Sequence, residues 1–125
     1  GITMAVMQSR DNRTEIAGVG GTTQFKFVTL DAGGAVTVAG TAGEQAYGIC
    51  LAGAAAGNAT TICVSGKVMV TAGGTIAAGA AVQTDAAGDA LTAASGDVVM
   101  GYAKEAGVDG QIIAIELIQG GNVVA

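Results

Sequence analysis

The chain has 125 residues, of which 50% are hydrophobic and only 12% are charged, and it contains neither histidine nor proline. This length is typical of one domain. The formal net charge is -5, and five basic residues against ten acidic ones argue against nucleic-acid binding, which needs clustered lysine and arginine. No apolar run is long enough to span a membrane, and no secretory signal pattern opens the sequence.

The chain has few large side chains with which to build a hydrophobic core. Two phenylalanines, two tyrosines and no tryptophan leave alanine to supply much of the hydrophobic content. A buried alanine methyl group contributes only about 0.8 kcal/mol, which predicts a thin core. We therefore expect self-association or docking to a partner to supply part of the stability.

The start of the sequence, residues 1–24, is predicted to be an N-terminal arm, followed by a single β-domain over residues 25–125. The segment is polar, ends in a glycine-rich run and contains both arginines, Arg10 and Arg13. One interpretation is a frayed terminus. The other is an arm that becomes ordered on a neighbouring subunit or partner, where the arginines pair with carboxylates and Glu15 makes a further contact.

Short apolar or alternating runs bounded by glycine and aspartate dominate the rest of the chain, and no stretch keeps a helical period. This pattern predicts an all-β fold, a compact, small β-barrel or sandwich-like domain of short strands that is β-tulip-like. The predicted strands are Gln24–Leu30, Ala35–Val38, Ala46–Leu51, Thr60–Val64, Lys67–Thr71, Ala80–Thr84, Ala90–Ala93, Val98–Lys104 and Gln111–Ile118.

Glycine and aspartate must form the turns, because proline is absent. The runs DAGG, from Asp31 to Gly34, and DAAG, from Asp85 to Gly88, place aspartate first and glycine fourth, as type I turns favour. Each is expected to close a β-hairpin. Further glycines expected to serve the fold are Gly101 and Gly110.

These turns belong to a longer internal similarity between residues 30–53 and residues 84–107. Each segment has a hairpin turn, a short threonine-containing strand, a glycine followed by an acidic residue, and an apolar strand. The similarity has two interpretations, a duplicated β unit or a chance match in an alanine- and glycine-rich sequence. The matched positions are Gly43 with Gly96, Glu44 with Asp97, and Gly48 with Gly101.

The sequence offers little for catalysis. The absence of histidine removes the usual general base and the common transition-metal ligand. The carboxylates are scattered beside glycines, where turn capping explains them better than a weak calcium site or catalysis does; those weighed are Asp85, Asp89, Asp97 and Asp109. An enzyme or ligand binder would need Asp85, Asp97, Asp109 or Tyr102 to converge in a cleft. We expect no enzymatic activity, no cofactor and no metal.

The two cysteines, Cys50 and Cys63, occupy the similar contexts ICL and ICV on strands joined by a glycine-rich loop. They could face each other across a hairpin. In a chain without an export signal, buried thiols are favoured over a disulfide, and two cysteines alone do not make a zinc site.

The run AYGICLAGAAAGNATTICVSGKVMV, followed by AGAAVQTDAAGDALTAASGDVVMGYAKEAGVDGQIIAIELI, resembles the small capsid decoration proteins of tailed bacteriophages, also called cement or head-stabilisation proteins. The resemblance covers roughly residues 46–118. It lies in the order of glycine and small-residue motifs, from Tyr47-Gly48-Ile49 through the AGxxV-like strand at Ala78 to the closing Asp109-Gly110.

The resemblance implies a β-domain on the outer surface of the phage capsid, made in the cytoplasm of the bacterial host. Such a protein is commonly a homotrimer that binds the major capsid protein, bridges its neighbouring subunits and stabilises the head. Deleting residues 1–20 is then expected to weaken binding to bare capsids and leave the β-domain folded. The alternative is another structural β-module, such as a head-fibre or spike base, a surface-layer module or an adhesin domain.

Overall fold

The computed structural model describes residues 8–123, and the side chains of residues 11–118. In this part of the chain there are nine strands and no helix, so the all-β prediction is confirmed. None of the described elements is a helix long and apolar enough to cross a membrane. The strands are β1 (Gln8–Ile16), β2 (Phe27–Leu30), β3 (Val36–Val38), β4 (Gly48–Ala52), β5 (Ala59–Thr71), β6 (Ala81–Thr84), β7 (Ala90–Thr92), β8 (Val98–Ala103) and β9 (Ile112–Val123).

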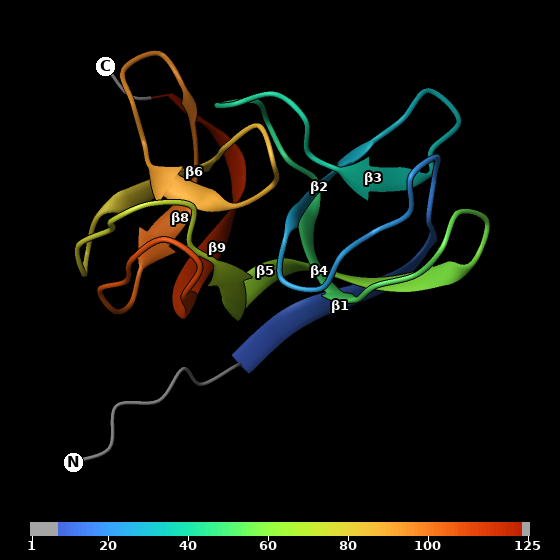
Figure 1. Cartoon of the computed structure of the whole chain (residues 1–125), viewed down its shortest axis with the longest axis horizontal. Coiled ribbons are helices and arrows are strands. Elements are labelled where there is room, and N and C mark those ends of the chain that lie inside the picture. Colours follow the sequence, from blue (N-terminus) through green and yellow to red (C-terminus); the bar gives the residue numbers. More distant parts are fainter. Residues whose placement is uncertain (1–7, 124–125) are drawn as a thin grey trace.

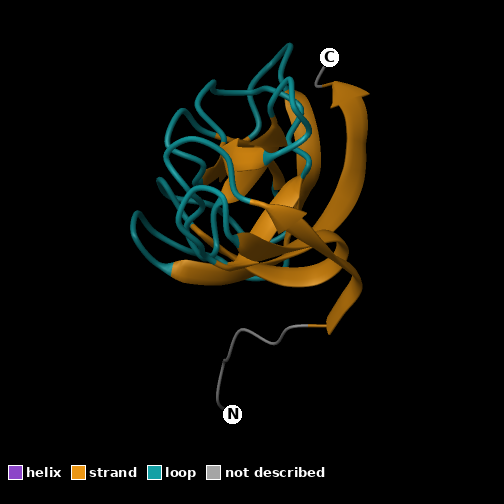
Figure 2. Cartoon of the chain, turned by 90° about the vertical axis from the view of Figure 1, so that its right-hand side faces the viewer, coloured by secondary structure: helices purple, strands orange, loops and turns teal. Residues whose placement is uncertain are grey.

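The strands form one sheet in the order β3-β2-β4-β5-β9-β8-β6-β7, with β1 paired to β5 beside this path. The pairs between named strands are all antiparallel. Figure 2 shows the strands curling along one side of the molecule, with the loops gathered on the other. The sheet is thus a curled half-barrel, which encloses the core without helices.

The two aspartate turns close the hairpins β2–β3 and β6–β7. Asp31 Oδ1 accepts hydrogen bonds from the N–H groups of Gly33 and Ala35, at 2.8 and 3.0 Å. Asp85 Oδ1 does the same for Ala87 and Asp89, at 2.8 Å each. The fourth residues, Gly34 and Gly88, adopt positive φ angles of 84° and 82°, a backbone conformation that glycine tolerates.

The sequence predicts separate strands on either side of Ser65 and Gly66, and this prediction is wrong. β5 continues through both residues, and its pairing with β1 shifts register there. Gly66 has a φ of 105°, as expected of a glycine at a bulge. The shift lets Cys63 and Val68, five positions apart in sequence, face the same hydrophobic cluster, so the bulge preserves burial on both sides of it.

β1 lies inside the segment predicted to be an arm. It pairs with β5 along its length, from Gln8 opposite Lys67 to Ile16 opposite Ala59. The sequence does not predict β1 as a strand, because an edge strand exposed on both faces has no alternating apolar pattern. Deleting residues 1–20 would therefore remove a strand of the sheet as well as any contact with a partner.

The strand pairing repeats along the chain. β2 pairs with β3 and β4, and β4 pairs with β5; β6 pairs with β7 and β8, and β8 pairs with β9. We call residues 17–71 unit 1 and residues 72–123 unit 2. Figure 1 shows unit 2 at the left and most of unit 1 at the right, with β5 running between them. β1 lies against β5 much as the second half of β5 lies against β9.

Backbone hydrogen bonds recur at equivalent positions of the two units. Phe25 N–H donates to Cys50 O and Gly79 N–H donates to Ala103 O, each at 2.7 Å. Repeated contacts of this kind favour a duplicated β unit over a chance match. Further donor–acceptor pairs that correspond are Thr22–Ala54 with Ile76–Gly107, Gly18–Val36 with Gly73–Ala90, and Ala39–Phe27 with Ala93–Ala81.

The core divides into a main cluster and a smaller one. The main cluster draws on both units and includes Phe27, Ile49 and Ile113. The smaller cluster belongs to unit 1 and consists of Val28, Val36, Cys50, Ile62 and Val64, with Tyr47 packed against it. The equivalent residues of unit 2 all lie in the main cluster; they are Val82, Ala90, Ala103, Ile115 and Leu117.

Cys50 and Cys63 are free thiols and both are buried, as expected from the sequence. They lie on adjacent strands but belong to different clusters, Cys50 to the smaller and Cys63 to the main one. Cys50 Sγ lies 3.5 Å from Thr60 Oγ1, and Cys63 Sγ donates to Ser65 O at 3.0 Å. Each thiol therefore serves as a small core side chain with a local polar contact.

Candidate partner-binding surface

Charged side chains of β1 gather around the ring of Tyr47. The Tyr47 hydroxyl donates a hydrogen bond of 2.6 Å to Glu15 Oε2. Arg13 Nη1 donates to the same hydroxyl at 3.4 Å, and its guanidinium carbon lies 6.0 Å from the ring centroid. Arg13 also pairs with Asp11 at 3.1 Å, and both partners of that pair are about half exposed. The alternation of a strand places these three β1 side chains on one face.

The electrostatics of this group keep Tyr47 neutral and Arg13 charged. Burial, and then the hydrogen bond to Glu15, raise the pKa of the Tyr47 hydroxyl above its ordinary value. Hydrogen bonds to Tyr47 and Asp11 raise the pKa of Arg13. At neutral pH the surface therefore presents a fixed positive group beside a tyrosine and two carboxylates.

A hollow of about 370 Å³ opens beside Tyr47, lined by both apolar and polar groups. Leu30 contributes an exposed apolar side chain, 51% accessible. Glu44 is held at the rim, because its Oε2 accepts from the N–H groups of Gly40 and Thr41. The lining residues are Thr29, Leu30, Glu44, Gln45, Ala46 and Tyr47.

Of the residues proposed from the sequence as partner contacts, Arg13 and Glu15 meet at Tyr47. Arg10 also lies on β1, but its side chain is outside the described part. Tyr47 and Leu30 were not expected from the sequence. A signal for Tyr47 exists, since only two tyrosines occur in the chain, whereas Leu30 reads as an ordinary strand residue beside a turn.

The carboxylates considered as catalytic or calcium-binding lie on turns and loops. Asp85 caps its turn, Asp89 pairs with Lys26, and Asp97 lies against Gly43. Neither these nor Asp109 and Tyr102 line the hollow beside Tyr47. Among residues 8–123, no three histidine, cysteine, aspartate or glutamate residues cluster as a metal site would require.

The described part of the chain is thus a curled sheet with a charged edge strand and a hollow beside Tyr47. The sequence model of the family described as phage cement protein matches residues 8–117, and the chain belongs to this family. It is accordingly a structural protein associated with the phage capsid, in agreement with the resemblance seen in the sequence.

A solved structure supports the fold. The chain is similar to the N base of head fiber gp8.5 of bacteriophage phi29, with 18% sequence identity and a TM-score of 0.72. The similarity covers 90% of this chain and 97% of the other. No curated protein matches the chain.

Proposed function

We propose that this protein binds the outer surface of the phage capsid and joins neighbouring subunits of the major capsid protein, which stabilises the head. The family match over residues 8–117 carries this proposal. The low content of charged residues supports it, because small polar and apolar surface groups suit packing against protein. The role is mechanical, and the protein takes no cofactor and performs no catalysis.

The charged face of β1 is the proposed contact with the capsid. Arg13 is about half exposed and already pairs with Asp11 beside Tyr47, but its guanidinium has further N–H donors that are able to bind a carboxylate of the major capsid protein. The hydrogen bond between Glu15 and Tyr47 fixes β1 relative to the segment that precedes β4, and so orients Arg13. Arg10 and Glu15 complete the proposed contact set.

The test is binding of the purified protein to mature capsids that lack it. We expect Arg13→Glu to weaken binding about tenfold or more, because it places a negative charge against a carboxylate. Thr75→Glu, which adds a negative charge on an exposed loop of unit 2, is expected to bind like wild type. A folded wild-type protein that does not bind such capsids would overturn the function; equal binding of both variants would overturn the β1 contact.

We also propose that the protein acts as a homotrimer. The thin core supports self-association, because contacts between copies add buried surface that a single chain lacks. The mass of the purified protein in sedimentation equilibrium tests this directly. A monomer at all accessible concentrations would contradict it without bearing on capsid binding.

The second candidate function is the base of a head fibre. The similarity in fold to the phi29 head-fibre N base supports this alternative. Electron microscopy of virions separates the two. Cement predicts a regular lattice of small knobs over the head, whereas a fibre base predicts longer projections rising from its sites.

A further inference from the structure

Within the chain, unit 1 and unit 2 contact each other through surfaces that are not equivalent to one another in the duplication. Phe27 N–H of unit 1 donates to Gly88 O of unit 2 at 2.7 Å. Gly43 N–H donates to Thr84 O at 2.9 Å, and Gly43 O accepts from Val98 N–H at 3.1 Å. Unit 1 thus offers the start of β2 and the loop after β3, while unit 2 offers its β6–β7 turn and the loop before β8.

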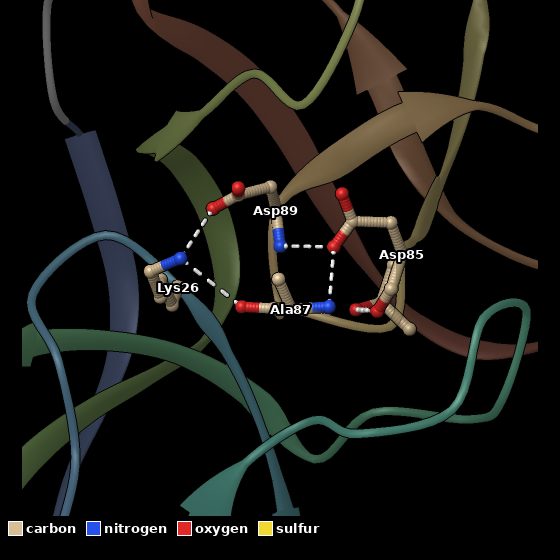
Figure 3. Close-up of polar contacts among 5 residues, drawn as sticks. Lys26, Asp85, Ala87 and Asp89 are labelled. Carbon is tan, nitrogen blue, oxygen red and sulfur yellow. Dashed lines mark hydrogen bonds and ion pairs between the residues drawn. The ribbon is translucent and has the colours of Figure 1, made fainter. Parts of the chain in front are cut away.

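An ion pair fastens this internal interface. Lys26 Nζ lies 2.8 Å from Asp89 Oδ1 and donates to Ala87 O at 3.1 Å, as Figure 3 shows. Both side chains are largely buried, at 25% and 18% accessible. Asp85 holds the turn that carries these acceptors by accepting from Ala87 and Asp89 N–H. The contact is therefore specific to one turn of unit 2.

Burial shows that the equivalent surfaces are left open. Ile49 of unit 1 is 0% accessible, whereas its equivalent in unit 2, Tyr102, is 45% accessible. Thr84 of unit 2 is 0% accessible, whereas its equivalent in unit 1, Leu30, is 51% accessible. The glycines of the interface follow the same rule, since Gly43 and Gly88 are buried and their equivalents, Gly96 and Gly34, are exposed.

Each chain therefore has two exposed surfaces. One, on unit 2, is equivalent to the surface by which unit 1 contacts unit 2, and the other, on unit 1, is equivalent to the surface by which unit 2 contacts unit 1. We call them the Tyr102 face of unit 2 and the Leu30 face of unit 1. The Tyr102 face consists of Ala80, Ala81, Gly96, Tyr102 and Glu116. The Leu30 face consists of Thr29, Leu30, Gly34, Ala35 and Gln45.

We infer that the Tyr102 face of one copy docks on the Leu30 face of a second copy, in the arrangement that unit 1 and unit 2 adopt within the chain. The occupant follows from continuity with the internal interface, because a second copy presents the same backbone at its Leu30 face as unit 2 presents at Thr84. Gly96 would then approach Leu30 as Gly43 approaches Thr84. The hollow lined by Leu30 and Tyr47 lies where that loop arrives.

The contact is heterologous, because the two faces differ. Head-to-tail contacts either close into a ring or continue as a filament. In a closed ring every unit would have the same kind of neighbour on each side. The inference thus rests on the proposed self-association and specifies which two surfaces form the contact between copies. It does not depend on binding to the capsid.

The side chains of the internal contact resemble those of a protein core, whereas those of the proposed contact resemble those of an interface between subunits. Lys26 and Asp89 have alanine equivalents, Ala80 and Ala35, so the ion pair favours the internal contact alone. In place of buried Ile49, the open face carries Tyr102, a residue enriched at interfaces between separate proteins. The ion pair therefore favours contact between the two units of one chain over the same contact between two chains.

Removal of the exposed side chains tests the two faces. We expect Tyr102→Ala and Leu30→Asp each to raise the dissociation constant of the oligomer about tenfold or more in sedimentation equilibrium. Val108→Asp, at a position 57% accessible on the β8–β9 turn, is the control and should associate like wild type. A monomeric wild-type protein, or variants whose association is unchanged, would overturn the inference. If Tyr102→Ala instead weakened only binding to bare capsids, the Tyr102 face would belong to the capsid contact.

A gain of association provides the sharper test. Ala80→Lys with Ala35→Asp would copy the Lys26–Asp89 pair into the proposed contact. We expect the double variant to associate about threefold to tenfold more tightly than either single variant, with the difference reduced by salt. A double variant no tighter than the singles would show that these residues do not meet and would reject this geometry.

Discussion

Phe25 in unit 1 and Gly79 in unit 2 occupy equivalent places and solve the same backbone problem with different residues. Each has a positive φ, 62° and 84°, and each N–H donates to the carbonyl of a β-strand residue, Cys50 or Ala103. A non-glycine residue in this region carries strain of about 1 kcal/mol or more. The fold thus dictates the same backbone conformation at both positions, while the side chain at that position differs between the units.

At another pair of equivalent positions, Gly48 and Gly101, the residue is the same, since both units have glycine there. A Cβ at Gly48 would collide with the carbonyl oxygen of Cys63, and one at Gly101 with that of Glu116. The obstacle is backbone of the neighbouring long strand in each case, so it cannot move aside as a flexible side chain could. Equivalent positions therefore stay identical where the constraint comes from the main chain.

The largest expected effect follows from this constraint. Gly48→Ala and Gly101→Ala should each lower the free energy of unfolding by about 3 kcal/mol, because strands must separate to admit the methyl group. Urea unfolding followed by circular dichroism measures the loss. Gly40→Ala is the control, since nothing lies near its Cβ position, and it should stay within about 0.5 kcal/mol of wild type. A clear difference between Gly48 and Gly101 would break the equivalence of the units.

The next prediction concerns the ion pair that joins the units. Lys26→Met or Asp89→Asn should cost about 1–2 kcal/mol of unfolding free energy, because each leaves a largely buried charged partner unpaired. The double variant should cost less than the sum of the single ones. Asp11→Asn, which removes a half-exposed pair with Arg13, serves as the control and should change stability little. Equal losses of unfolding free energy at the Lys26–Asp89 and Arg13–Asp11 pairs would contradict a special role for the ion pair between the units.

Local chemistry explains which parts of the fold the sequence predicts. The hairpin turns at Asp31 and Asp85 are predicted because aspartate and glycine at fixed positions have one favoured backbone outcome. The joining of two predicted strands into β5 is missed, because Gly66 can signal either a turn or a bulge. Only the partners across the sheet decide between these outcomes, and they are distant in sequence.

The candidate surface was harder to predict than the fold. Arg13 and Glu15 are identified by charge in a polar segment, but their meeting point at Tyr47 depends on the pairing of β1 with β5. Leu30 and Tyr102 are exposed, whereas the residues at the equivalent positions of the other unit, Thr84 and Ile49, are buried. Exposure of this kind is a property of the assembled fold and leaves no mark in local sequence.

A smaller effect tests the strain at Phe25 apart from its ring. Phe25→Gly should be more stable than Phe25→Ala by about 1 kcal/mol, because both lose the ring and only alanine keeps the strain of a positive φ. Gly79→Ala should lower stability by a similar amount. Thermal unfolding of the three variants and wild type gives the comparison. If alanine were as stable as glycine at position 25, the two positions would not share a conformation.

The smallest effect concerns the tyrosine that has no counterpart on the surface of unit 2. Burial and the hydrogen bond to Glu15 raise the pKa of Tyr47, so the folded state holds that proton more tightly than the unfolded state does. The resulting stability is fully present below the pKa of an unfolded tyrosine, about 10, and is lost as the pH rises through the folded value. Tyr47→Phe should lower stability by less than about 1 kcal/mol at neutral pH and remove this part of the alkaline decline. Wild-type protein measured under the same conditions is the reference. Urea unfolding between pH 8 and 11 compares them, and an unchanged alkaline decline in Tyr47→Phe would place its origin elsewhere.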